Sequence, residues 1–230
     1  MRPDSDRTAE DVLADEIAGL LVRTEAVAFR TDPFFTFTSG VQSPVYVDNR
    51  RLLGFPDARR VVVAALVAAA RALAPEAVAG TATAGIAWAA WIADALDLPM
   101  MYVRSGAKRW GRQQAVEGLA TAGARTLLVE DLAFSGGSLV AAAEQLHAAG
   151  YRVEECLTIV TYGMPAAQRD FERAGVRHRS LTTIDTALAV AHTTGALSSE
   201  HTDLVREWLA RQRDEQSAAT GAPAPAAGGA

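Results

Sequence analysis

The sequence RTLLVEDLAFSGGS, residues 125–138, contains the pattern that decides the fold. It begins with an apolar run short enough for a buried strand, and the run ends in Glu130 and Asp131. A turn of small residues follows at positions 135–138, and residues 139–150 have the pattern of a helix closed by a glycine. This order of strand, acidic pair, glycine turn and helix predicts half of a βαβ unit, with its functional groups at the carboxyl edge of the strand.

The residue types in this stretch suit the binding of a phosphorylated ligand. Glycines allow backbone amides to approach an anion closely, and the amino terminus of the helix adds its dipole. The two carboxylates beside the turn could bind ribose hydroxyls or, through water, a hard cation such as Mg²⁺. The alternative is an ordinary strand-to-helix turn with a solvated acidic pair, because a glycine pair after a strand is weak evidence alone.

The complete pattern is more specific than its parts. An apolar strand, two acidic residues, three further residues and then Ser/Thr-Gly-Gly-Ser resemble the phosphoribosyl-diphosphate (PRPP) motif of type I phosphoribosyltransferases. The acidic pair is Glu-Asp rather than Asp-Asp, which is similar to the orotate branch of that family. The turn is not a Walker loop, because no Gly-Lys-Ser/Thr follows it.

The composition narrows the class of protein. At 230 residues, of which 50% are apolar, the chain can bury one sizeable core, and one α/β domain is the simplest count. A net charge of −5 argues against general nucleic-acid binding. We expect a soluble, cytoplasmic protein without a membrane span, because no apolar run is long enough and the sequence shows no signal peptide. Cys156 is the only cysteine, which excludes an internal disulfide.

One lysine stands out in a chain that otherwise uses arginine. Of the 22 basic residues only Lys108 is a lysine, and it lies in SGAKRWGRQQAVEG, residues 105–118, which we predict to be a mobile loop. A compact ammonium group suits a site that stabilises charge, whereas chance or a solvated charged face is the plain alternative. Together with Arg104, the stretch resembles the catalytic loop of the same family, R-x-x-x-K-x-H-G-x-x-x-x-x-E-G. In that family the loop closes over PRPP, typically in the active site of the partner subunit.

Periodicity and turn residues predict the remaining elements. Helices are expected at residues 8–27, 56–73, from 85 onward, 165–174 and 204–213, and strands at 77–80, 100–103, 151–161 and 179–184. Residues 34–51, FFTFTSGVQSPVYVDNRR, are expected to form a hairpin that turns at Ser39 and Gly40. Residues 81–85 are small and follow a strand, and they resemble the pyrophosphate loop of the family.

The hairpin carries a second family resemblance. Its pattern F-T-x-x-S-G-x-x-S-P-x-Y-x-D-x-R resembles the N-terminal hood of orotate phosphoribosyltransferases, which lies over the base and contributes to the dimer. An ordinary capping hairpin is the alternative. We therefore expect an N-terminal helix and hood hairpin over residues 1–55, a phosphoribosyltransferase core over 56–213, and a low-complexity, disordered tail over 214–230.

The resemblance covers roughly residues 8–212 in motif order and is closest to the Bacillus-like branch. That branch also shows Asp-Asn-Arg after the hood and Gly-Thr-Ala-Thr-Ala-Gly-Ile-Ala before the second helix. The implied fold is the type I phosphoribosyltransferase fold, a mostly parallel sheet flanked by helices, with an N-terminal hood. The implied reaction makes orotidine 5′-monophosphate and diphosphate from orotate and PRPP with Mg²⁺. A homodimer is expected, with loop 105–117 acting in the partner's site.

The resemblance also implies roles for individual residues. Lys108, Arg104 and Asp131 are expected to be catalytic, and Asp131 could reach the metal through water, with no direct metal ligand assigned. The residues expected to bind substrate are Thr81, Thr83, Arg104, Lys108, Trp110, Glu130, Asp131, Leu132, Ala133, Phe134, Ser135, Gly136, Gly137 and Ser138.

The chain departs from the family pattern at two aromatic positions. Trp110 stands where the family loop has His, and Phe134 stands where the family has Ser or Thr. Indole has a single N–H donor and cannot become cationic, and a phenyl ring lacks the hydroxyl that could bond a polar base. Two alternatives stay open: a phosphoribosyltransferase for another heteroaromatic base, and a non-catalytic regulator that senses PRPP or nucleotides. The intact Lys108 argues against the regulator, because a pure binder would not need it.

Overall fold

The computed structural model describes residues 7–36, 42–104 and 115–218. Within these ranges, six strands form the central sheet, in the order β10-β9-β8-β5-β6-β7. Neighbouring strands are parallel except at the edge, where β7 runs antiparallel to β6. The strands are β5 (Ala77–Thr81), β6 (Met100–Val103), β7 (Val116–Gly118), β8 (Arg125–Ala133), β9 (Arg152–Thr161) and β10 (Arg177–Thr183).

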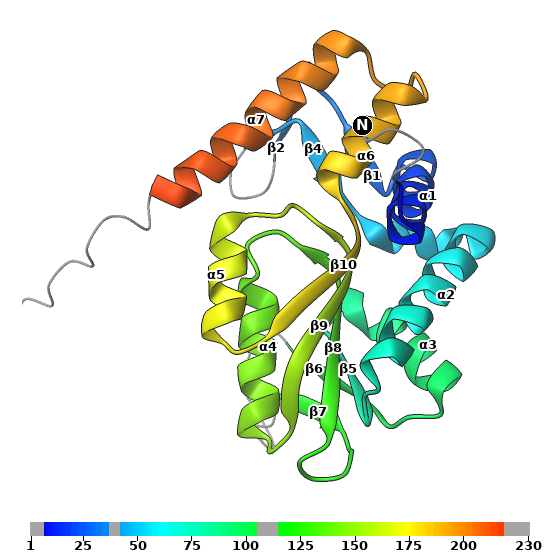
Figure 1. Ribbon diagram of the computed structural model, residues 1–230, viewed down its shortest axis with the longest axis vertical. Coiled ribbons are helices and arrows are strands. Elements are labelled where there is room, and N and C mark those ends of the chain that lie inside the picture. The colour runs from blue at the N-terminus through cyan, green and yellow to red at the C-terminus, as the bar shows by residue number, and fades with distance from the viewer. Residues whose placement is uncertain (1–6, 37–41, 105–114, 219–230) are drawn as a thin grey trace, which may run out of the picture.

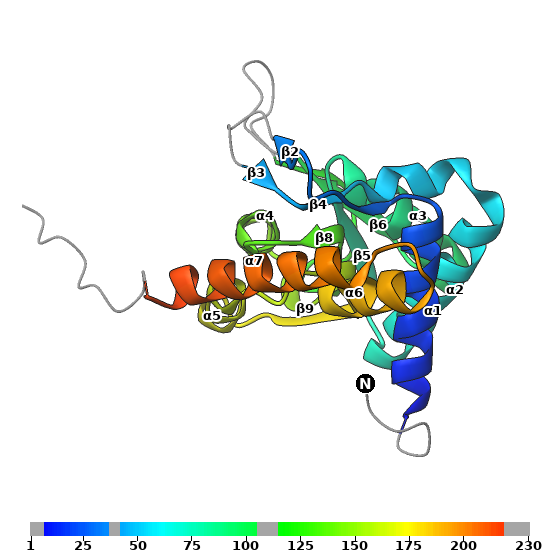
Figure 2. The same cartoon turned by 90° about the horizontal axis from the view of Figure 1, so that it is seen from above.

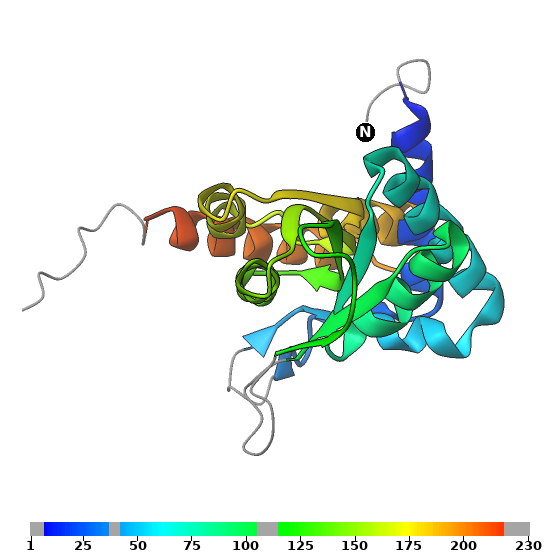
Figure 3. The same cartoon turned by 90° about the horizontal axis from the view of Figure 1, so that it is seen from below.

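Helices cover both faces of the sheet (Figures 1 and 3). The helices are α1 (Ala9–Arg23), α2 (Pro56–Leu73), α3 (Ala84–Leu96), α4 (Gly137–Ala148), α5 (Pro165–Arg173), α6 (Ile184–Thr193) and α7 (Ser199–Ala218). Helices α1, α2 and α3 lie on one side of the sheet, and α4 and α5 lie on the other (Figure 3). No helix in the described part of the chain is long and apolar enough to cross a membrane.

The N-terminal strands lie beyond the end of the sheet at which β8 stops (Figures 1 and 2). These are β1 (Val27–Phe29), β2 (Phe35–Thr36), β3 (Gln42–Ser43) and β4 (Val45–Val47), followed by the 3₁₀ helix η2 (Asn49–Gly54). The predicted hairpin exists as the β2–β3 pair, whose turn at residues 37–41 lies outside the described residues. The prediction was wrong for residues 45–47, which were expected to complete this hairpin. They form β4, which pairs with β1 instead.

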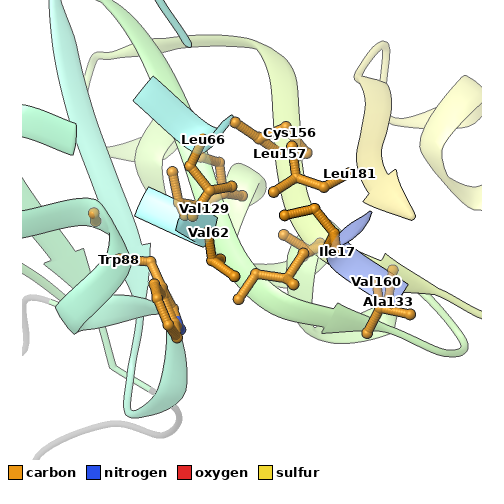
Figure 4. Packing of buried hydrophobic residues seen from close by; sticks show 14 of the residues in the cluster. Ile17, Val62, Leu66, Trp88, Val129, Ala133, Cys156, Leu157, Val160 and Leu181 are labelled. Atoms are coloured by element: carbon orange, nitrogen blue, oxygen red, sulfur yellow. The ribbon is translucent and has the colours of Figure 1, made fainter. Parts of the chain in front are cut away.

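The hydrophobic core extends over both faces of the sheet, and one part of it lies between α1, α2, α3 and the sheet. Figure 4 shows Ile17, Val62 and Trp88 of the helices facing side chains of the sheet such as Val129, and all four are at most 1% exposed. Small residues in α3 allow this helix to approach the sheet closely, as described below. Cys156 in β9 is part of the same core, and burial raises the pKa of its thiol well above the ordinary value. The thiol is therefore structural.

Several predicted boundaries were wrong for identifiable reasons. The strand predicted to end before the acidic pair continues to Ala133, because β9 runs beside it and pairs with it up to Thr161. The C-terminal helix continues through Ala218, so the first part of the predicted tail is helical, and the rest lies outside the described residues. Strand β7 and helix α6 were not predicted at all. Helix α2 and strand β6 match their predicted bounds.

Candidate active site

The acidic pair projects from the sheet at the point where a neighbouring strand has ended. The last residue of β8 that pairs with β5 is Val129, opposite Gly80. From Glu130 onward β8 is paired with β9 alone. One long edge of β8 is therefore free of a strand at Glu130 and Asp131, and the groups of other elements can approach the carboxylates there.

Burial controls the ionisation of the two carboxyl groups. Glu130 is 8% exposed, and its burial raises the pKa to about 7, partly offset by a hydrogen bond from Thr81. Burial also raises the pKa of Asp131, and a hydrogen bond with Glu130 is the largest effect in the opposite direction. The two carboxyl groups therefore interact directly, and burial favours the protonated form of each. In this state the pair can both donate and accept hydrogen bonds, which suits a sugar diol.

Two residues of η2, Asn49 and Arg50, act on Asp131. The Asn49 side chain donates from Nδ2 to the main-chain carbonyl of Asp131, at 2.8 Å. The charge of Arg50 lowers the pKa of the Asp131 carboxyl. Arg50 is also bound by Asp48, whose Oδ1 lies 2.5 Å from Arg50 Nε. The segment at Asn49 and Arg50 thus supplies a hydrogen bond to the backbone of Asp131 and a positive charge that acts on its carboxylate.

The glycine turn after β8 presents backbone amides at the start of a helix. Gly136 is the N-cap of α4 and has φ of +75°, a conformation that favours glycine. A Cβ there would also lie 3.1 Å from Phe171 Cζ and 3.2 Å from Ala167 Cβ, so α5 closes one side of the turn. Among the residues that the structure describes, no side chain caps the start of α4, and Ser135, Gly137 and Ser138 are exposed. The first N–H groups of α4 therefore have the geometry of an anion-binding helix start.

The small-residue loop between β5 and α3 lies against the same strand. A Cβ on Gly85 would lie 2.4 Å from the Val129 carbonyl oxygen and 3.3 Å from Glu130 Cα. A Cβ on Gly80 would lie 2.6 Å from the Gly85 carbonyl oxygen. Glycine at both positions lets the first turn of α3 contact β8 backbone to backbone. The loop itself contains a cis peptide between Ala82 and Thr83, and Thr83 is exposed at the N-cap of α3.

Arg104 follows the end of β6 and lies next to this loop. The N–H of Ala82 donates to the carbonyl of Val103 at 2.7 Å, which ties the loop to the residue before Arg104. The Arg104 guanidinium is about one-third exposed and lies 3.5 Å from the Glu117 carboxylate. Antiparallel pairing of β6 with β7 brings together the two ends of the predicted catalytic loop. Lys108 and Trp110, with the rest of 105–114, lie outside the described residues.

Phe134 lies at the exposed end of the motif. Its ring is 38% exposed and packs edge-on against Tyr162, with centroids 4.8 Å apart and an interplanar angle of 90°. Leu132 and Ala133, which the sequence also assigned to the substrate site, pair with β9, and Ala133 is buried. An aromatic ring, rather than a hydroxyl, is therefore presented to a ligand at this position.

The described residues do not form a complete metal cage. Among them, no three His, Cys, Asp or Glu residues come close enough to hold a metal ion. The adjacent carboxylates of Glu130 and Asp131 fit a hydrated Mg²⁺ that takes most of its ligands from substrate and water. This donor set fits a metal that arrives with a phosphorylated substrate.

Sequence reasoning missed three residues that shape this site. Asn49 was only part of an Asp-Asn-Arg pattern, and no local signal shows that it reaches a strand 82 residues away. Gly80 and Gly85 flank the Thr-Ala-Thr-Ala sequence, and their spacing could have indicated a close backbone contact.

Comparisons with known proteins agree with this geometry. A family model described as "Phosphoribosyl transferase domain" matches residues 58–191. The orotate phosphoribosyltransferase of Coxiella burnetii is 40% identical over 180 residues, which cover 77% of this chain and 86% of the relative. The Bacillus caldolyticus orotate phosphoribosyltransferase is 40% identical over 194 residues, covering 84% of this chain and 94% of the relative. The solved structure of orotate phosphoribosyltransferase from Aeropyrum pernix is 35% identical with a TM-score of 0.69, covering 79% of this chain and 99% of that one.

Proposed function

Because this chain belongs to the phosphoribosyltransferase family and, within it, to the orotate phosphoribosyltransferases, we propose that it transfers the phosphoribosyl group of PRPP to orotate. The products are orotidine 5′-monophosphate and diphosphate, in pyrimidine synthesis. One observation supports this most directly: the carboxylate pair at the end of β8 lies between the amino termini of α4 and α3. A sugar with phosphate groups at both ends matches such an arrangement.

The carboxylates and the glycine turn would hold the phosphoribosyl group itself. Glu130 and Asp131 bind the two ribose hydroxyls, and the amides at residues 135–138 bind the 5′-phosphate. The shared proton of the pair allows one carboxyl group to donate while the other accepts. Buried carboxyl groups with fixed partners orient the ribose without reorganisation, which lowers the entropic cost of reaching the transition state.

The second half of the site would stabilise the leaving group. As the bond from the anomeric carbon to diphosphate breaks and the bond to the orotate nitrogen forms, positive charge develops on the ribose and negative charge on diphosphate. We assign the loop at residues 81–85, including Thr81 and Thr83, to diphosphate binding, together with Arg104 and Lys108. Arg104 would exchange its contact with Glu117 for the substrate. Closure of loop 105–117 would exclude water, which otherwise hydrolyses PRPP.

Mg²⁺ would be the cofactor of this reaction. When bound with PRPP, it neutralises negative charge on the diphosphate oxygens as the leaving group departs. Asp131 would hold the ion through a bound water, in keeping with the general use of Mg²⁺ with PRPP in this family. Asp131 therefore serves the ribose and the metal water from one position.

The assembly that we propose is a homodimer in which loop 105–117 acts in the partner's site. If this is right, mixing Lys108→Ala subunits with Asp131→Asn subunits creates hybrid dimers that each contain one intact site. Activity should return on mixing, and failure to recover any despite proven subunit exchange would contradict catalysis in trans. We expect the enzyme to work in the cytoplasm and to require neither nucleic acid nor a membrane.

The test of the proposed function is a turnover assay with PRPP and Mg²⁺ against orotate, uracil and purine bases. Orotate should be the preferred acceptor. The alternative of another heteroaromatic base rests on Phe134 and Trp110, and preference for uracil or a purine would support it. Asp131→Asn should keep the fold and nearly abolish turnover, because a ribose or metal-water contact loses its charge. Near-normal turnover of that variant would contradict a role for Asp131 in binding the ribose or the metal water.

A further inference from the structure

Asn49 is a fully buried polar residue outside the sequence motifs of the active site. It lies at the start of η2 and is 0% exposed. Its Nδ2 donates to the Asp131 carbonyl at 2.8 Å, and this bond spans 82 residues of sequence. Because a carbonyl can only accept, the bond also fixes which end of the amide faces β8.

The backbone of β8 needs such a donor at this position. Strand β5 supplies partners to β8 only as far as Val129. Beyond that residue, a carbonyl that points to the β5 side would be buried without a partner, at a cost of about 1–3 kcal/mol. The Asn49 amide takes the place of the missing strand at Asp131 and lets β8 remain extended where it carries the carboxylates.

The opposite side of Asn49 is anchored to the N-terminal helix and strands. The N–H of Asp48 donates to the Ala26 carbonyl at 2.8 Å, and Arg51 Nε donates to the Thr24 carbonyl at 3.0 Å. Residues on both sides of Asn49 are thus fixed to the segment between α1 and β1. Asn49 forms a direct hydrogen bond from this anchored segment to β8.

From these contacts we infer that Asn49 is a positioning residue for PRPP, which holds Asp131 in the orientation that binds the ribose. The inference rests on the proposed function, because it assumes that Asp131 contacts PRPP. The Asn49 Oδ1 has no hydrogen-bond partner within the described residues. A buried amide with an unpaired oxygen costs folding stability, which fits a side chain whose role is to donate to Asp131. Asn49 acts through Asp131 and touches no reacting atom.

The experiment compares Asn49→Ala and Asn49→Leu with Leu53→Ala, a control in the same 3₁₀ helix whose side chain is 40% exposed. PRPP affinity is measured by calorimetry with Mg²⁺, beside steady-state kinetics and melting temperatures. Both Asn49 variants should bind PRPP roughly tenfold more weakly, the scale of leaving one buried acceptor unpaired. The KM for PRPP should rise by a larger factor than kcat falls, because the Asp131 carboxylate itself is retained in these variants. Asn49→Leu should do so without the loss of melting temperature that a cavity causes.

A double-mutant cycle with Asp131→Asn decides whether the effect passes through Asp131. Adding Asn49→Ala to Asp131→Asn should weaken PRPP binding little further. Unchanged PRPP affinity in the folded Asn49 variants, or losses that add independently, would overturn the inference. If the wild-type protein bound PRPP but turned over no orotate, the proposed function would fail while the PRPP titrations would still decide the role of Asn49.

Discussion

Replacing Gly85 by alanine tests whether the contact between α3 and β8 sets the geometry of the site. The added Cβ would lie 2.4 Å from the Val129 carbonyl oxygen and 2.7 Å from Thr81 Oγ1. Ordinary van der Waals contact begins at 3.4 Å, so the helix and the strand must separate by 1 Å. The Val129 oxygen belongs to the backbone of the central strand and cannot rotate away. The separation therefore moves the backbone next to Glu130.

The size of the effect follows from two general scales. Overpacking a well-packed contact costs about 1–3 kcal/mol, which for a chain of this size lowers the melting temperature by roughly 2–12 °C. A displacement of about 1 Å at a catalytic group can cost on the order of 100-fold in rate. We therefore expect Gly85→Ala to lose stability moderately and kcat/KM severely.

Urea unfolding and steady-state kinetics measure both quantities, with Gly54→Ala as the matched control. A Cβ on Gly54 meets no atom within 4 Å, so this change should leave kcat/KM unaltered and stability equal or slightly higher. Wild-type stability together with wild-type kcat/KM in Gly85→Ala would refute the proposed role of this contact. Loss of stability with full activity in the folded fraction would show that the contact serves the fold alone.

Three further predictions concern single side chains. Lys108→Ala should lower kcat by roughly 100-fold with saturating PRPP. Lys108→Arg should recover kcat only in part, because a planar guanidinium replaces a compact ammonium. A wild-type kcat in the alanine variant would mean that the single lysine is an accident of composition. Because burial raises the pKa of Glu130 from 4.5 to about 7, the ligand-free folded protein keeps a proton that the unfolded chain loses, and the free energy of unfolding should fall as the pH rises from 4.5 to 7. Denaturant titrations of Glu130→Gln should show a flatter profile over this range, and an unchanged slope would contradict the buried state of this carboxyl. Phe134→Ser removes the edge-on contact with Tyr162, which should cost about 0.5–1.5 kcal/mol, and should change the KM for orotate but not for PRPP; equal changes in both would place Phe134 away from the base.

Local sequence patterns were sufficient for the elements that carry strong periodicity. Helix α2 was predicted at its observed bounds, because proline marks its start and apolar residues recur along one face. The strand, acidic pair, glycine turn and helix were also recognised in order, since each step changes residue type abruptly. The resemblance to the orotate branch is confirmed by relatives at 40% identity.

Contacts between distant segments could not be predicted from local sequence patterns. Two carboxylates after an apolar stretch normally end a strand, whereas pairing with β9 continues β8 through Glu130 and Asp131. The pairing of β4 with β1 depends on a three-residue strand that has no periodicity of its own. The hydrogen bond from Asn49 depends on where β5 ends, which is a property of the assembled sheet.

The burial of Cys156 has a practical consequence for labelling. The thiolate is the form that reacts with maleimides and disulfide reagents, and a fully buried thiol with a raised pKa stays unreactive while the protein is folded. Because this cysteine is the only one in the chain, a second cysteine introduced at an exposed position can be labelled alone in an otherwise native background. Leu119, at 79% exposure beside β7, is a suitable attachment point for a fluorophore. In the unlabelled protein, the rate at which Cys156 itself becomes modified would report how often the central sheet opens.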